Sequence, residues 1–257
     1  MSASTVILTG AGISAESGIP TFRGPEGYWR VGSTNYQPQE LATLDAFRRM
    51  PDEIWAWYLW RRSVCWAAKP NAAHEALVAL EKKLGDEFLL VTQNVDGVHL
   101  RTGNTPARTF QIHGNVDFRR CAAECTAELH PVTLDESWDK ERKLTREEAV
   151  ALACPRCGSI TRPHVLWFDE YYDEERFRFE SSLRAAESCR TLVVVGTSGA
   201  TNLPTQMCIA AAKNGAKLIV VGPEATPFSE LALESGGEFL QGKAVEHVPA
   251  LCARLSR

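Results

Sequence analysis

Short runs of apolar residues recur along this chain, and they are nearly continuous rather than alternating with polar residues. Strands buried on both faces of a parallel sheet have this pattern. The predicted strands are residues 5–9, 88–92, 109–112, 192–195 and 217–221. Helical patterns lie between them at residues 52–68, 71–84 and 203–214. The alternation predicts an α/β fold with a Rossmann-like, doubly wound parallel sheet.

Two regions interrupt the alternation. Residues 24–39 are rich in Gly, Pro, Ser and Asn, and they predict a long loop of the kind that is usually functional in compact domains. Residues 119–162 are polar and charged, which indicates a small module inserted between two strands. We therefore expect a Rossmann-like domain over residues 1–118 and 163–257, with a helical insertion around 24–70, and a separate small module over 119–162.

Composition and charge exclude several classes of protein. The chain has 257 residues, of which 44% are hydrophobic and 23% charged, as in an ordinary soluble globular protein. The net charge of −4 gives no electrostatic reason to bind nucleic acid or an anionic membrane. The N-terminus has no basic region, and no stretch approaches the roughly 20 apolar residues of a membrane span. We expect a cytoplasmic protein, with a monomer favoured and neither nucleic acid nor membrane as a partner.

A glycine-rich turn follows the first predicted strand. Residues 10–15 read Gly-Ala-Gly-Ile-Ser-Ala and fit the pattern G-x-G-x-x-A, with Gly10, Ala11, Gly12 and Ala15 as candidate phosphate contacts. Glycines let the backbone approach a pyrophosphate, although a tight turn with close packing gives the same letters. A dehydrogenase should carry an acidic residue about 20 positions later, to hold the adenine ribose. That place is taken by the long loop, which disfavours redox use of a dinucleotide.

A series of motifs resembles the sirtuin family. Residues 10–24, Gly-Ala-Gly-Ile-Ser-Ala-Glu-Ser-Gly-Ile-Pro-Thr-Phe-Arg-Gly, are similar to the opening signature of that family. The further matches are residues 92–97, 112–114, 162–165, 167–168, 196–198 and 223–224. They cover nearly the whole chain. The resemblance implies a Rossmann domain joined to a zinc domain, with NAD and an acylated lysine of a protein substrate meeting in the cleft between them.

The resemblance also implies the reaction, NAD-dependent removal of acyl groups from lysine. In such enzymes the acyl oxygen attacks the nicotinamide ribose and nicotinamide leaves. A base then activates a ribose hydroxyl, and the acyl group ends on ADP-ribose.

His113 is the candidate base because it follows a predicted strand, where α/β sheets place their chemistry, and because histidine titrates near neutral pH. A lone histidine would more often be a core residue satisfied by hydrogen bonds. The resemblance assigns the catalytic role to His113, together with Asn94. It also places Gln93 and Asn94 at the ribose and Asp96 at the nicotinamide amide. Asn94 is equally suited to capping the helix that follows it.

Further NAD contacts are implied by the resemblance on three segments. The first segment lies on the long loop, where an arginine would contact the pyrophosphate. The second follows the fourth predicted strand and would contact the adenine ribose. The third would contact the adenine. These residues are Thr21, Phe22, Arg23, Gly196, Thr197, Ser198 and Ala244. Relatives usually have Asn at the position of Gly222, so a ribose contact there must come from the backbone or be lost.

Four of the eight cysteines form two close pairs, Cys121-x3-Cys125 and Cys154-x2-Cys157, separated by 28 residues. In a cytosolic chain, close pairs indicate metal ligands rather than disulfides. Two such pairs can supply a closed tetrahedral site of four thiolates, which would make the zinc ion structural. The alternative is four thiols without a metal in a polar insert.

Tyr58 and Arg61 are three residues apart on a predicted helix and so share a face. They resemble the Tyr-x-x-Arg pair of sirtuins that accept succinyl and malonyl groups, and an arginine fork binds a carboxylate in a bidentate way. The alternative is a helix with its tryptophans in the core and its arginines in solvent. We expect desuccinylation or demalonylation to exceed plain deacetylation.

Val165, Trp167 and Phe168 correspond to the segment that pairs with the extended substrate in the family, a form of strand addition. Asp169 stands where relatives usually have glycine, which indicates a preference for basic flanking residues.

Two other functions stay open. An NAD-dependent ADP-ribosyltransferase shares the first chemical step, and a non-catalytic protein that binds NAD and zinc would have no use for a base beside the ribose.

Overall fold

The structure is a computed structural model that describes residues 3–20, 29–31, 34–134 and 137–257. Its largest element is a parallel sheet of six strands in the order β11-β10-β9-β1-β4-β5. These strands are β1 (Thr5–Thr9), β4 (Phe88–Thr92), β5 (Thr109–Gln111), β9 (Thr191–Val195), β10 (Lys217–Gly222) and β11 (Glu238–Gln241). Thr9 is level with Thr92 on one side and Val195 on the other, so the carboxyl ends of the central strands meet at one edge.

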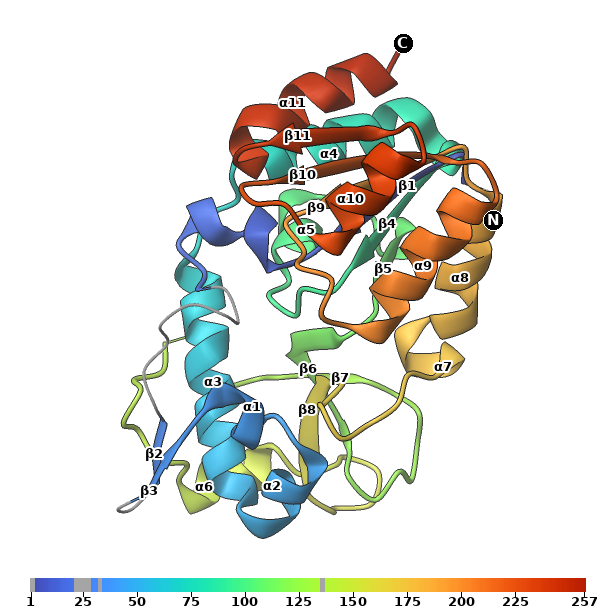
Figure 1. The fold of residues 1–257 in the computed structure, drawn as a ribbon. Coiled ribbons are helices and arrows are strands. Elements are labelled where there is room, and N and C mark those ends of the chain that lie inside the picture. Colours follow the sequence, from blue (N-terminus) through green and yellow to red (C-terminus); the bar gives the residue numbers. More distant parts are fainter. Residues whose placement is uncertain (1–2, 21–28, 32–33, 135–136) are drawn as a thin grey trace.

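Helices cover both faces of this sheet (Figure 1). One layer is made of α8 (Phe179–Ser188), α9 (Asn202–Lys213) and α10 (Pro227–Glu234), and the other of α4 (Ala72–Leu84) and α11 (Ala244–Leu255). In β1, Val6 and Leu8 pack on the first layer, while Ile7 packs on the second. Burial on both faces explains the continuous apolar run, and the predicted doubly wound α/β fold is confirmed.

A smaller unit lies below the parallel sheet in Figure 1. Its antiparallel sheet has the order β7-β6-β8, and helices α1, α2, α3 and α6 lie around it. The bounds are β6 (Gly114–Cys121), β7 (His130–Pro131), β8 (Thr161–Val165), α1 (Pro38–Leu41), α2 (Leu44–Arg49), α3 (Pro51–Ala67) and α6 (Arg146–Ala151). Trp55, Trp138 and Trp167 are buried in its core. The small sheet extends a few residues beyond the predicted module of residues 119–162 on each side, and the division into domains stays a prediction.

Two further helices and one two-stranded ribbon complete the described α-helices and strands. The helices are α5 (Val98–Thr102) and α7 (Glu174–Phe177), and β2 (Trp29–Val31) pairs with β3 (Thr34–Tyr36) in an antiparallel ribbon. Part of the predicted loop over residues 24–39 is therefore strand. Isolated aromatics among Gly and Pro had no alternation that would have revealed it.

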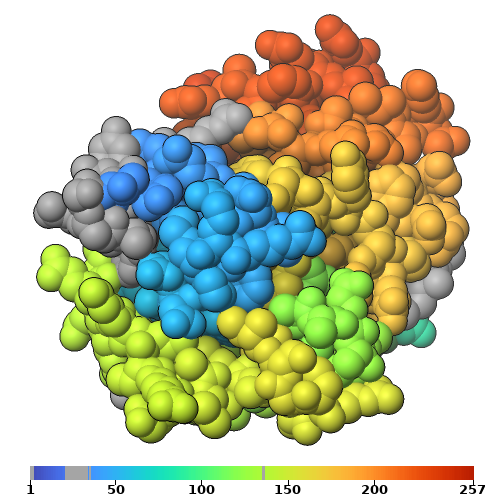
Figure 2. All heavy atoms as spheres, turned by 90° about the horizontal axis from the view of Figure 1, so that it is seen from below, coloured from blue at the N-terminus to red at the C-terminus, as the bar shows by residue number. Residues whose placement is uncertain are grey.

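Figure 2 shows the molecule from below, where the helical segment of α1 to α3 and the segment around residues 125–160 lie side by side. Both segments contribute to one core, since Tyr58 of α3 and Leu152 after α6 belong to the same apolar cluster. Over the described part of the chain, every helix is too short or too polar to cross a bilayer.

Candidate active site and metal centre

The predicted cofactor residues gather at the carboxyl edge of the parallel sheet. The turn after β1 contacts the turn after β9 directly, because the Gly10 N–H donates to the Val195 carbonyl at 2.9 Å and the Gly12 N–H donates to the Gly196 carbonyl at 2.8 Å. A Cβ atom on Gly12 would lie 2.6 Å from the Gly196 Cα, and Gly196 has φ +63°. Close packing thus accounts for these glycines by itself.

Ala11 and Ala15 lie in two short 3-10 helices, Ala11–Ile13 and Ala15–Ser17, rather than in a long α-helix. Between them Ser14 is buried, and its hydroxyl donates to the Asp96 carboxylate at 2.8 Å. The Asn94 amide donates to the Gly10 carbonyl at 3.1 Å and approaches the Ser14 hydroxyl at 3.3 Å. The turn after β1 and the segment after β4 are therefore one hydrogen-bonded unit.

The cap alternative for Asn94 does not hold. Helix α5 starts after Gly97, and the Val98 N–H donates to Asp96 Oδ1 at 2.9 Å. Asp96 supplies the acceptor at this helix end, while the Asn94 side chain faces the β1 turn. Both side chains are at least nine-tenths buried.

Gln93 links the segment after β4 to the segment after β9. Its amide nitrogen donates to the Thr197 hydroxyl at 2.9 Å, and its amide oxygen accepts from Thr201 at 2.9 Å. Ser198 is exposed beside this network, and Ala244 begins α11, which contacts the β1 turn. The Gly222 carbonyl accepts from the Gly242 N–H at 2.9 Å, so this part of its backbone is engaged.

His113 follows β5 and lies between the two units. Its Nδ1 atom is 3.0 Å from the Gln93 carbonyl oxygen, and its Nε2 atom is 2.7 Å from the Tyr172 hydroxyl. Burial lowers the pKa of His113 to about 4, although the hydrogen bond to Gln93 acts in the opposite direction. The imidazole is therefore neutral at pH 7, which is the form that a general base needs.

Tyr58 lies on α3 and is buried, with its hydroxyl accepting a hydrogen bond from the Trp167 indole at 2.8 Å. Arg61 is half-buried one turn later, with its guanidinium 5.3 Å from the centre of the Trp57 ring. Arg61 also lies beside Ile19 and Pro20, the last described residues before the long loop. The alternative of core tryptophans with solvated arginines holds only in part, because Trp55 and Trp57 are buried but Arg61 is half-buried rather than solvated.

The segment after β8 is attached to both units. The Leu166 N–H donates to the His113 carbonyl at 2.9 Å, and the Phe168 N–H donates to the Ala42 carbonyl at 3.0 Å. The side chain of Trp167 is buried, whereas that of Phe168 is 60% exposed. Val165 ends β8, which pairs with β6 and is an edge strand among the described strands of its sheet.

Asp169 uses its carboxylate within the fold. Its two oxygens accept the backbone N–H groups of Leu44 at 2.7 Å and Asp45 at 3.1 Å, which are at the start of α2. A carboxylate at a helix N-terminus satisfies donors that have no partner within the helix. Thr21, Phe22 and Arg23, the predicted loop contacts, lie outside the described residues.

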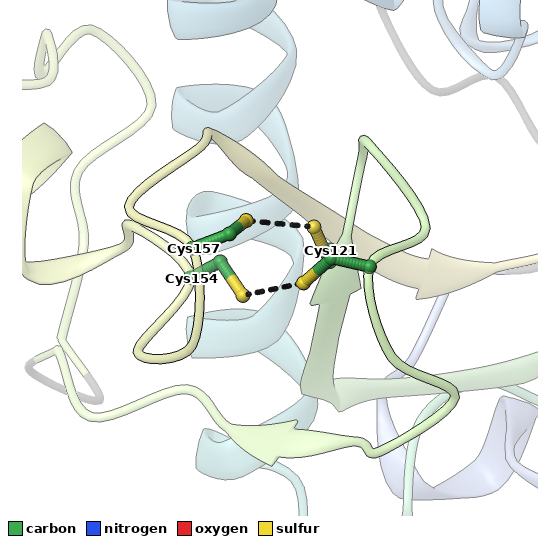
Figure 3. Close-up of side chains that lie close together, drawn as sticks. Cys121, Cys154 and Cys157 are labelled. Carbon is green, nitrogen blue, oxygen red and sulfur yellow. Dashed lines mark hydrogen bonds between the residues drawn. The ribbon is translucent and has the colours of Figure 1, made fainter.

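The four paired cysteines converge in the smaller unit. The Sγ atoms of Cys121 and Cys157 are 3.6 Å apart, as are those of Cys125 and Cys154, and all four lie within 4.8 Å of one another. Figure 3 shows Cys121, at the end of β6, facing Cys154 and Cys157 in the segment before β8. A tetrahedral zinc with Zn–S bonds of about 2.3 Å needs sulfurs about 3.8 Å apart. The group can hold one zinc ion, as the spacing predicted.

Three polar residues of the site were missed by the sequence predictions. Ser14 lies inside the glycine-rich turn, where the pattern leaves its position free. His74 is fully buried, with Nε2 3.4 Å from the Ser14 hydroxyl. Tyr172 contacts His113 across 59 residues of sequence. Only Ser14 offered a local signal, since a hydroxyl next to the predicted phosphate turn is a natural polar contact.

Comparison with known proteins agrees with this geometry. The sequence profile of the Sir2 family matches residues 10–202. The chain is 40% identical over 244 residues to an NAD-dependent protein deacylase of Leptospira interrogans, an alignment that covers 95% of this chain and 89% of the relative. It is similar to the crystal structure of a Sir2 homologue in complex with NAD, with 35% identity, a TM-score of 0.81, and coverage of 98% of this chain and 88% of that one.

A complex of a Sir2 homologue mutant with 2'-O-acetyl ADP-ribose is equally close, with 35% identity and a TM-score of 0.79. It covers 98% of this chain and 91% of that structure. The similarity therefore extends over nearly the whole chain and both units of the fold.

Proposed function

Because the chain belongs to the Sir2 family and is an NAD-dependent protein-lysine deacylase, we propose that it prefers acidic acyl groups, succinyl and malonyl, over acetyl. The observation that carries this preference is the arrangement of Tyr58, which contacts Trp167, and Arg61 one helical turn apart on α3. A carboxylate at the end of an acyl chain needs donors where acetyl needs none.

The hydrogen bonding of Tyr58 supports this role. Its oxygen accepts from the Trp167 indole, and no acceptor takes its own proton among the residues that the structure describes. The hydroxyl can therefore donate its proton in a hydrogen bond to a carboxylate. Burial raises the pKa of Tyr58, so the phenol keeps that proton throughout the neutral range. Arg61 adds the positive charge and a planar pair of donors.

NAD supplies the glycosidic bond that is broken and the ribose that receives the acyl group. In the proposal, the turn at Gly10 to Ala15 and the Arg23 guanidinium hold its pyrophosphate, and Phe22 shields the reactive ribose carbon from water. Asp96 binds the carboxamide, and the residues after β4 and β9 hold the riboses. The residues present fit this task, because the Ser14, Asn94 and Gln93 side chains converge at the edge where parallel α/β sheets bind nucleotides.

His113 acts as the general base. Its imidazole is neutral at pH 7 and can take a proton from a ribose hydroxyl through the nitrogen that does not bond to Gln93. Asn94 orients the ribose from the neighbouring strand end. A base contributes about 10²- to 10⁴-fold to a rate when it is correctly placed.

The substrate protein binds in extended form along the segment from Val165 to Phe168. β8 is an edge strand in the described part of its sheet, which leaves backbone groups for strand addition. The Asp169 carboxylate lies next to this segment in the chain and caps α2, and a preference for basic flanking residues stays part of the proposal.

Zinc has a structural role in the proposal, since four thiolates leave no coordination position for water or substrate. Thiolate ligands are typical of a reducing compartment, and we propose a cytoplasmic monomer that acts on proteins rather than nucleic acid or membranes.

A direct comparison of succinyl-, malonyl- and acetyl-lysine peptides of one sequence tests the acyl preference. Equal or higher kcat/KM for acetyl-lysine would contradict it.

A further inference from the structure

The two ring nitrogens of His113 have different partners, and these fix its tautomer. A backbone carbonyl only accepts hydrogen bonds, so the proton of the neutral ring is on Nδ1, which faces the Gln93 carbonyl oxygen. Nε2 is then an acceptor, and the Tyr172 hydroxyl donates to it at 2.7 Å. The nitrogen that the base uses is thus occupied by a phenol.

Tyr172 is held in place by contacts that do not involve the catalytic residues. Its ring stacks on Phe179 of α8, with the centroids 5.9 Å apart and the planes at 27°. The ring also packs against the core layer of α8 and α9. Burial raises the pKa of Tyr172 to about 12, although a hydrogen bond with Thr201 lowers it, so the hydroxyl remains a donor at neutral pH.

The charged side chains on the elements around His113 have partners of their own. These pairs are Asp96 with Ser14, Asp117 with Arg62, Asp169 with the start of α2, Asp173 with Arg176, and Arg178 with the Phe110 ring. Burial and the Gln93 carbonyl account for the pKa of His113. Tyr172 is therefore the titratable side chain that contacts this imidazole in the described part of the chain.

We propose that Tyr172 is a positioning residue for the catalytic base. Its phenol holds the imidazole in the Nδ1-protonated form with the Nε2 lone pair facing the site, and it gives up Nε2 to the ribose hydroxyl when the base acts. The catalytic meaning of this contact rests on the proposed function of His113, whereas the contact itself does not.

The test is an NMR titration of the ¹⁵N-labelled protein without NAD or peptide, from pH 7.5 to 3.5, in which His113→Gln assigns the His113 signals. The wild-type ring should be neutral, with its proton on Nδ1. Tyr172→Phe keeps the ring on Phe179 and removes the donor that favours the neutral imidazole. The pKa of His113 should therefore rise by about 0.5–1 unit.

Tyr171→Phe is the matched control, because it makes the same chemical change at a residue that is 91% exposed. It should leave the His113 titration at its wild-type position. The proposal is overturned if Tyr172→Phe and Tyr171→Phe titrate alike. It is also overturned if the wild-type ring carries its proton on Nε2, a result that does not depend on any variant folding.

The titration involves no turnover, so its outcome tests the role of Tyr172 separately from the proposed function. A missing shift would leave the deacylase activity standing. Conversely, a protein that releases no nicotinamide could still show the Tyr172 contact.

Discussion

The Trp167 indole N–H lies 2.8 Å from the Tyr58 hydroxyl oxygen, which joins α3 to the segment after β8. This bond uses the oxygen of Tyr58 as an acceptor and leaves its proton for another partner. Arg61 follows one turn later on α3, close enough for its charge to act on the Tyr58 hydroxyl.

Arg61→Met should lower kcat/KM for a succinyl-lysine peptide by about 10- to 100-fold, since a hydrogen bond to a charged group contributes about 1.5–3 kcal/mol. The value for the matching acetyl-lysine peptide should change less than about threefold, because acetyl has no carboxylate to lose a partner. Arg48→Met, an exposed arginine on α2, is the control. An unchanged succinyl rate in Arg61→Met would rule out the proposed recognition.

The structure indicates one zinc ion per chain. Metal analysis of the purified protein should give a stoichiometry near one, and Cys154→Ser should lose zinc and deacylase activity together, because a structural metal contributes directly to folding. Cys189→Ala, a buried cysteine outside the cluster, should retain both. An active preparation without zinc would refute the structural role.

Stability should fall as the pH decreases from about 6.5 toward 5. Burial lowers the pKa of His99 and His113 to about 4, and of His74 and His164 to about 3. In this window the unfolded chain binds protons that the folded chain excludes, so each histidine costs up to about 1.4 kcal/mol per pH unit.

Urea unfolding at several pH values measures this slope. His164→Gln should reduce it by about one proton, because one of the buried neutral rings is removed. A free energy of unfolding that is constant between pH 7 and 5 would contradict the burial of these rings in neutral form.

Asp169 should contribute to stability as well as to substrate binding. Asp169→Ala removes both acceptors at the start of α2 and should cost about 1 kcal/mol of unfolding free energy, with a higher KM for the peptide. Asp169→Asn retains one side-chain acceptor, so its free energy of unfolding should lie between those of the wild type and Asp169→Ala. If the alanine variant unfolds at the same midpoint temperature as the wild type, the cap does not contribute to stability.

The elements that the sequence predicted correctly are those whose cause is local. The strands at residues 5–9 and 88–92 were predictable because burial on both faces leaves continuous apolar runs, and the cysteine cluster because ligand spacing is short. The contact between His113 and Tyr172 had no such signal, since packing of α8 brings them together. Asp169 caps α2 through the N–H groups of Leu44 and Asp45, which precede it in the sequence by 125 and 124 positions. Only the fold brings these residues into contact.

Mass spectrometry of the products formed from NAD and a succinyl-lysine peptide shows whether this chain transfers an acyl group from lysine to ADP-ribose. We predict free nicotinamide, unmodified lysine peptide and succinyl-ADP-ribose, with acyl transfer reduced by about 10²- to 10⁴-fold in His113→Ala, while binding of NAD is retained. ADP-ribose attached to the protein would favour a transferase instead. If no acylated peptide causes release of nicotinamide, the assigned deacylase activity is wrong.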